Sequence, residues 1–127
     1  MDEMIDDQYC LNYLKELLKT LSCEDPVQQH RIPREVMWNL PSDIACEWEY
    51  ESIEFFIRIL ADDHVISRDM EEKFHEICDH FEKASAKGTQ YYDPMIWTIE
   101  GFVKHPFWKN QRKSARQLLD ALEKIQL

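Results

Sequence analysis

The sequence predicts an all-α protein, and two observations support this prediction. Apolar residues recur three and four positions apart through most of the 127 residues, a spacing that places them on one face of a helix. Only two glycines occur, Gly88 and Gly101, so the tight turns of a β fold have few residues to form them. We expect one all-helical domain over residues 1–127, a compact bundle of five main helices plus one short helix.

The first predicted helix ends near Ser22, before Asp25-Pro26. Its apolar face contains Met4, Cys10, Leu11, Leu14, Leu17, Leu18 and Leu21. Residues 26–32 are polar and are expected to form a loop. The short helix is expected at residues 33–39, opened by a proline.

Two further helices are predicted over about residues 42–61 and 67–87. Ser42 and Ser67 are suitable N-caps, because a serine hydroxyl accepts a hydrogen bond from a backbone N–H of the first turn. The first inner face comprises Ile44, Ala45, Trp48, Ile53, Phe56, Ile57 and Leu60. The second comprises Met70, Phe74, Ile77, Cys78, Phe81 and Ala84.

The last two helices are expected on either side of Lys104-His105-Pro106. Asp93-Pro94 predicts the start of the first, with a capping residue followed by an N1 proline. The final helix is expected from about Phe107 to Glu123. Its inward residues are Trp108, Ala115, Leu118, Leu119, Leu122 and Ile125.

The composition is strongly acidic, with 25 Asp and Glu against 15 Lys and Arg, a formal charge of −10. This balance disfavours nucleic acid, because neutralising phosphates requires a basic surface. It equally disfavours anionic membranes, whereas a basic protein would be attracted. The first residues lack the basic and apolar pattern of a signal peptide, and no apolar run approaches a membrane span. We therefore expect a cytoplasmic protein with four reduced cysteines.

The acidic residues concentrate in the first 93 residues, which carry −13, whereas residues 94–127 carry +3. In a continuous helix, acids at positions 43, 47, 51 and 54 share one face, and those at 69, 72, 76 and 79 form a second stripe. Repulsion between acids four apart costs about 0.2–0.5 kcal/mol per pair, which suggests that a partner uses them. The alternative is a solvated face that maintains solubility.

Tyr91 and Tyr92 add a candidate aromatic contact, because tyrosine is enriched in binding hot spots. The alternative for this pair is packing over the end of the bundle. The candidate partner-binding residues are therefore Asp43, Glu47, Glu51, Glu54, Asp62, Asp63, Glu72, Glu76, Tyr91 and Tyr92.

Residues 72–80 also suggest a metal site, since Glu72 and His75 have the E-x-x-H spacing of helical di-iron proteins. The second E-x-x-H that such a site needs is missing, and apolar residues take the inward face of this helix. We expect no metal, no cofactor and no catalytic residue. The alternative function is a helical metal-dependent enzyme using His75, Glu76, Asp79 and His80.

The segment Pro33-Arg-Glu-Val-Met-Trp-Asn-Leu-Pro41-Ser-Asp-Ile-Ala-Cys-Glu-Trp48-Glu and the later His105-Pro-Phe-Trp108 carry a family resemblance. With these segments, and as a small, acidic chain predicted to be helical, the protein resembles the bacterial immunity proteins of contact-dependent growth inhibition systems. The resemblance implies an inhibitor that binds a cognate toxin domain, often a basic nuclease, as a monomer or weak dimer. A helical adaptor for another basic protein is a further alternative.

Overall fold

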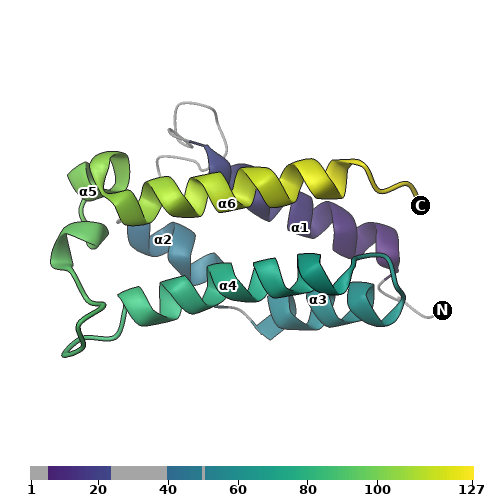
Figure 1. Ribbon diagram of the computed structural model, residues 1–127, viewed down its shortest axis with the longest axis horizontal. Coiled ribbons are helices and arrows are strands. Elements are labelled where there is room, and N and C mark those ends of the chain that lie inside the picture. The colour runs from purple at the N-terminus through teal and green to yellow at the C-terminus, as the bar shows by residue number, and fades with distance from the viewer. Residues whose placement is uncertain (1–5, 24–39, 50) are drawn as a thin grey trace.

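Six α-helices and one 3₁₀ helix make up the ordered elements of the computed structural model, which describes residues 6–23, 40–49 and 51–127 (Figure 1). In chain order these are α1 (Asp7–Ser22), α2 (Leu40–Glu47), α3 (Glu51–Asp62), α4 (Arg68–Ala84), η2 (Pro94–Trp97), α5 (Ile99–Lys104) and α6 (Pro106–Glu123). Those ranges contain no strand, so the predicted all-α class is confirmed there. The short helix expected at residues 33–39 lies outside the described residues.

Four long helices surround the core in the cyclic order α1, α3, α4, α6. Each runs antiparallel to both of its neighbours, and α2, η2 and α5 lie together at the end where α4 finishes (Figure 1). None of the helices in the described ranges is both long and apolar enough to cross a membrane.

Helix α1 follows the predicted pattern closely. The Asp6 carboxylate caps it by accepting a hydrogen bond from the Tyr9 N–H at 2.8 Å. The helix ends at Ser22, as expected. Its predicted apolar face is buried at Cys10, Leu11, Leu14, Leu17, Leu18 and Leu21, whereas Met4 lies outside the described residues.

The single helix expected at residues 42–61 is wrong: α2 ends at Glu47 and α3 begins at Glu51. Trp48 lies in the turn between them, where its N–H bonds to the Ala45 carbonyl at 3.0 Å. Its indole is buried and packs against Phe74 and Phe81 of α4, at ring distances of 6.4 and 6.3 Å. We infer that burying this large aromatic side chain outweighs the loss of the helical hydrogen bonds at the break.

The helix expected from residue 93 to 104 is also divided, into η2 and α5. The Thr98 hydroxyl caps α5 by accepting a hydrogen bond from the Gly101 N–H at 2.9 Å. Gly101 is buried against the Met95 carbonyl, an approach that a Cβ atom would prevent. The glycine therefore allows the chain to turn tightly between the two short helices.

Helices α4 and α6 agree with the prediction except at their ends. Ser67 caps α4 through the Met70 N–H, at 3.1 Å, but the helix stops at Ala84 rather than near Lys87. Helix α6 begins at Pro106, one residue earlier than expected. The core between them contains Trp108, which contacts four rings, those of Phe81, Trp97, Phe102 and Phe107.

Candidate protein-binding surface

The first acidic stripe predicted from the sequence does not exist as one helical face, because the chain breaks between Glu47 and Glu51. Asp43 and Glu47 belong to α2 and are half-buried, whereas Glu51 and Glu54 are exposed on α3. Burial and the neighbouring Asp43 charge raise the pKa of Glu47. The α2 pair is therefore less available to a partner than the α3 pair.

The two acidic helices α3 and α4 are neighbours, as the prediction required. The Glu54 carboxylate on α3 pairs with the His75 Nε2 of α4 at 3.1 Å, which joins the outer faces of the two helices. Bases lie among the acids: Arg58 approaches Glu54 at 3.9 Å and Arg68 approaches Glu72 at 3.8 Å. The negative charge is therefore partly compensated locally, unlike the bare stripe expected from the sequence.

The turn between α3 and α4 adds carboxylates next to the start of α1. Asp62 and Asp63 are both exposed there. A side-chain hydrogen bond to Asp63, desolvation and the charges of Asp63 and Asp6 raise the pKa of Asp7. The raised pKa of Asp7 reflects the crowding of carboxyl groups at this corner of the bundle.

An aromatic cluster lies beside these acids on α1 and α3, and the sequence analysis did not identify it. It consists of Tyr9, Tyr13, Phe55 and Phe56. The Phe56 ring lies 5.8 Å from that of Tyr9, 5.0 Å from that of Tyr13 and 6.2 Å from that of Phe55. Tyr9 and Phe55 are 54% and 52% exposed.

The signal for this cluster was present in the helical spacing. Tyr9 and Tyr13 are four apart and outside the inner face of α1. Phe55 is likewise outside the inner face of α3, on an outward row with Glu51, Arg58 and Asp62. An aromatic residue on a predicted solvent face was the observation that could have revealed the site.

Tyr91 and Tyr92 lie at the opposite end of α4 from the Asp62-Asp63 turn. Tyr91 is 52% exposed with Lys83 above its ring at 5.4 Å, while Tyr92 is half-buried and lines a cavity of about 320 Å³. Because α4 has 17 residues, roughly 25 Å separates the tyrosine pair from that turn. The structure does not bring all the predicted partner-binding residues together.

The histidines of the alternative metal site point toward different helices. His75 contacts Glu54 of α3, whereas the Nδ1–H of His80 donates to the Gln111 Oε1 of α6 at 3.1 Å. Over the described ranges, no three His, Cys, Asp or Glu side chains are grouped to hold a metal ion. The geometry therefore gives this alternative no ligand set.

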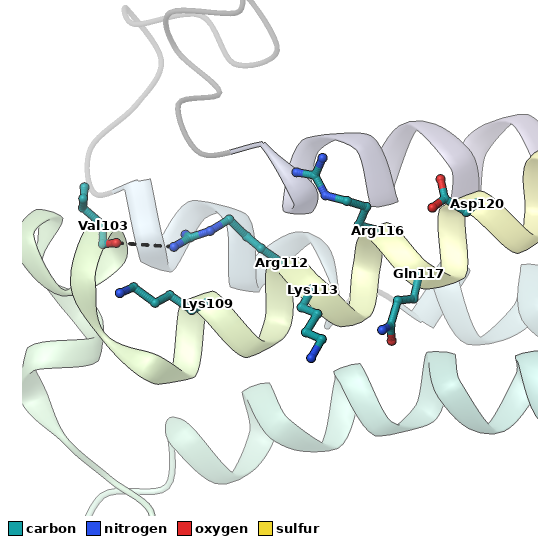
Figure 2. Close-up of a pocket in the computed structure, with 7 residues that line it drawn as sticks. All are labelled: Val103, Lys109, Arg112, Lys113, Arg116, Gln117 and Asp120. Carbon is teal, nitrogen blue, oxygen red and sulfur yellow. Dashed lines mark hydrogen bonds between the residues drawn. The ribbon is translucent and has the colours of Figure 1, made fainter.

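A basic cavity of about 660 Å³ lies along α6, near α5 and the end of α1 (Figure 2). The described residues that line it are Val103, Lys109, Arg112, Lys113, Arg116, Gln117 and Asp120. Arg112 donates to the Phe102 carbonyl at 2.8 Å, and Arg116 donates to the Ser22 carbonyl at 3.0 Å. Among the described lining residues, four are cations and one is an acid, in a protein of net charge −10.

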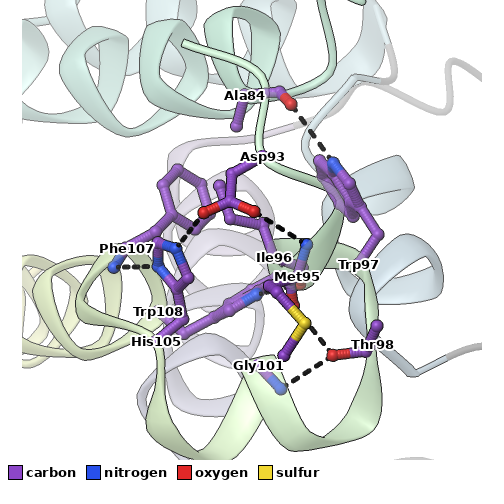
Figure 3. Close-up of polar contacts among 10 residues, drawn as sticks. All are labelled: Ala84, Asp93, Met95, Ile96, Trp97, Thr98, Gly101, His105, Phe107 and Trp108. Carbon is purple, nitrogen blue, oxygen red and sulfur yellow. Dashed lines mark hydrogen bonds and ion pairs between the residues drawn. The ribbon is translucent and has the colours of Figure 1, made fainter.

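An Asp–His pair at the α5 end resembles half of a catalytic triad, but its hydrogen bonds assign it to the fold (Figure 3). The His105 Nδ1 accepts a hydrogen bond from the Phe107 N–H at 3.0 Å, so the Nε2–H donates to Asp93 at 3.0 Å. That bond and the Met95 N–H lower the pKa of Asp93. Because both ring nitrogens are engaged, the imidazole offers no lone pair to act as a base.

Comparison with known proteins gave no match: no protein-family model fits the chain, and no curated protein or solved structure is significantly similar to it.

Proposed function

We propose that this chain is an immunity protein, which binds a basic toxin domain on its α1–α3 face and blocks it stoichiometrically. The observation that carries the proposal is the aromatic cluster in which Tyr9 and Phe55 are exposed beside the partly buried Tyr13 and the buried Phe56, with carboxylates nearby. The immunity role itself rests on the family resemblance, and the cytoplasmic location expected for this chain fits it.

The aromatic cluster provides what an interface core needs. The exposed rings of Tyr9 and Phe55 both contact the buried Phe56 ring, which orders them, so binding buries apolar area at a low entropic cost. On the outward row of α3, the exposed Glu51 lies one turn before Phe55 and the exposed Asp62 two turns after it, with Arg58 between Phe55 and Asp62. Such acids would attract a basic partner and raise the association rate more than the affinity.

The other exposed apolar side chains suit a basic partner less well. Met95, Ile99 and Val103 are 45%, 55% and 54% exposed at the α5 end. The charges on α5 are Glu100 and Lys104, which pair with each other at 3.6 Å. This end therefore lacks the excess of carboxylates found beside Phe55.

A charge-reversal pair tests the electrostatic part of the proposal. The probe is a toxin domain encoded by a gene adjacent to that of this chain, if that gene encodes one. Glu51→Lys with Asp62→Lys should slow its association by roughly tenfold at low salt, and should weaken growth protection during co-expression. The control, Asp79→Lys with Glu82→Lys, changes the net charge equally at two exposed acids of α4. Equal slowing by both pairs would show that only net charge matters.

An aromatic pair of variants tests the location. Phe55→Ala and Tyr91→Ala remove rings of equal exposure, 52%, one from α3 and one from beyond the end of α4. We expect Phe55→Ala to raise the dissociation constant by at least about tenfold and Tyr91→Ala to leave it unchanged. A raised dissociation constant for Tyr91→Ala with none for Phe55→Ala would favour a contact at the tyrosine pair predicted from the sequence.

An adjacent gene that encodes no toxin would favour the adaptor alternative.

A further inference from the structure

We propose that the basic cavity along α6 binds an elongated polyanion of small-molecule size that carries phosphate groups. This site is separate from the proposed partner surface. Ser22, which contacts Arg116, lies 13 residues along α1 from Tyr9, a distance of about 20 Å. The cavity can therefore be tested independently of the toxin-binding proposal.

The cations form a row on one side of α6. Lys109, Lys113 and Arg116 are exposed, at relative positions 0, +4 and +7, and the side chains of Lys109 and Lys113 extend from the helix beside Arg112 (Figure 2). Within the described ranges, none of these three exposed residues has a carboxylate at ion-pair distance. Lys109, Lys113 and Arg116 therefore bring positive charge to the cavity with which no described carboxylate pairs.

Two guanidinium groups on this side are held in place by backbone carbonyls. Arg112 is 8% exposed and bonds to the carbonyls of Phe102 and Val103, at 2.8 and 3.4 Å. Arg116 bonds to the Ser22 carbonyl. Fixing a flexible side chain before a ligand arrives removes part of the entropic cost of binding. A guanidinium has five donors, so the Arg116 bond to Ser22 leaves N–H groups for an anion.

The order of charges along α6 gives the helix little stabilisation. Its four cations lie between residues 109 and 116, and its two acids, Asp120 and Glu123, lie toward the C-terminus. The helix dipole favours the reverse order, and cations three or four apart repel one another. The carbonyl bonds of Arg112 and Arg116 give these two cations a structural role, whereas neither local interaction favours Lys109 and Lys113. A bound anion gives these two lysines a physical reason.

The dimensions favour an extended ligand over a single small ion. The cavity volume of about 660 Å³ lies within the roughly 300–1,000 Å³ of small-molecule sites. Lys109 to Arg116 spans seven residues, or about 10 Å along the helix axis. A chain of linked phosphates can contact cations along this whole length at once, whereas a lone phosphate reaches only neighbouring ones.

Titration with inorganic tripolyphosphate, followed by calorimetry and by amide NMR of the whole chain, tests the site. We expect saturable binding of one ion per chain, with shifts centred on residues 109–117 and at least about tenfold tighter than inorganic phosphate. Lys109→Glu with Lys113→Glu should weaken it roughly tenfold or more. Both lysines are exposed, so the fold should persist, which the NMR spectrum checks.

The control is Lys73→Glu with Lys83→Glu, two exposed lysines of α4 that give the same change in net charge. Its affinity for tripolyphosphate should change less than about twofold. Non-saturable binding, or equal weakening by the control, would overturn the proposal. Binding of a poly-glutamate peptide at this site without tripolyphosphate binding would also overturn it and assign the site to an acidic protein segment.

Discussion

Trp108 offers the sharpest test of the packing described here. It is fully buried, and its Nε1–H donates to the Ile96 carbonyl at 2.7 Å. Trp108→Phe removes that donor and part of the ring while keeping an aromatic side chain. The effect therefore combines one lost hydrogen bond with one small cavity.

The magnitude follows from these two losses. Leaving the Ile96 carbonyl buried and unpaired costs about 1–3 kcal/mol. Complete truncation of a buried Trp or Phe to alanine costs about 3–5 kcal/mol, so the smaller change to Phe adds about 1–2 kcal/mol. We expect a loss of about 2–5 kcal/mol in the free energy of unfolding, a large part of the roughly 5–15 kcal/mol of a typical domain.

Urea unfolding followed by far-UV circular dichroism measures this loss, with the slope m unchanged. Trp97→Phe is the matched control, because the half-buried Trp97 also donates to a carbonyl, that of Ala84, at 3.2 Å. Water can replace that donor more easily, so we expect a smaller loss of about 1 kcal/mol. If Trp108→Phe lowers the free energy of unfolding no more than Trp97→Phe does, the buried Trp108 hydrogen bond and ring do not contribute the stability expected of them.

Two further predictions concern stability. Gly101→Ala places a Cβ against the Met95 carbonyl and should lower the free energy of unfolding, measured in urea, by about 1–3 kcal/mol or more. Gly88→Ala, where φ is 84° and no atom lies within 4 Å of the added Cβ, should cost about 1 kcal/mol from backbone strain. Equal losses in the two variants would contradict the close approach of Gly101 to Met95. Asp63→Asn removes the carboxylate that raises the Asp7 pKa above its ordinary value of 3.8. A carboxyl group whose pKa is raised in the folded state stabilises the fold at low pH, and this stabilisation is lost as the pH rises through the folded-state pKa. Asp63→Asn should therefore be more stable than wild type at pH 7 and lose that advantage in acid. An advantage that does not depend on pH would contradict this cause.

The sequence predicted the long helices well because their apolar spacing directly reflects burial. Leu11, Leu14 and Leu18 of α1, and Phe74, Ile77 and Phe81 of α4, lie inside as expected. The break after Glu47 could not be read from that spacing, because Ile44 and Ile53 remain inward on both sides of it. Trp48 packs on α4 at this break, a tertiary contact that the spacing does not report.

The candidate surface was predicted only in part for a similar reason. Exposed acids such as Glu51 and Asp62 were identified from charge spacing alone. Tyr9 and Tyr13 lie more than forty residues from Phe56 in the chain, so their contact with it depends on how α1 packs against α3. Likewise, the cavity along α6 depends on the bonds from Arg112 to the end of α5 and from Arg116 to the end of α1.

Cross-saturation NMR of the labelled chain with the cognate toxin domain reports directly whether a basic partner binds the α1–α3 face. We expect the largest intensity losses at Tyr9, Tyr13, Phe55 and their neighbours, with little change at residues 91–103. Losses confined to residues 91–103, with the aromatic cluster unaffected, would contradict binding at this face.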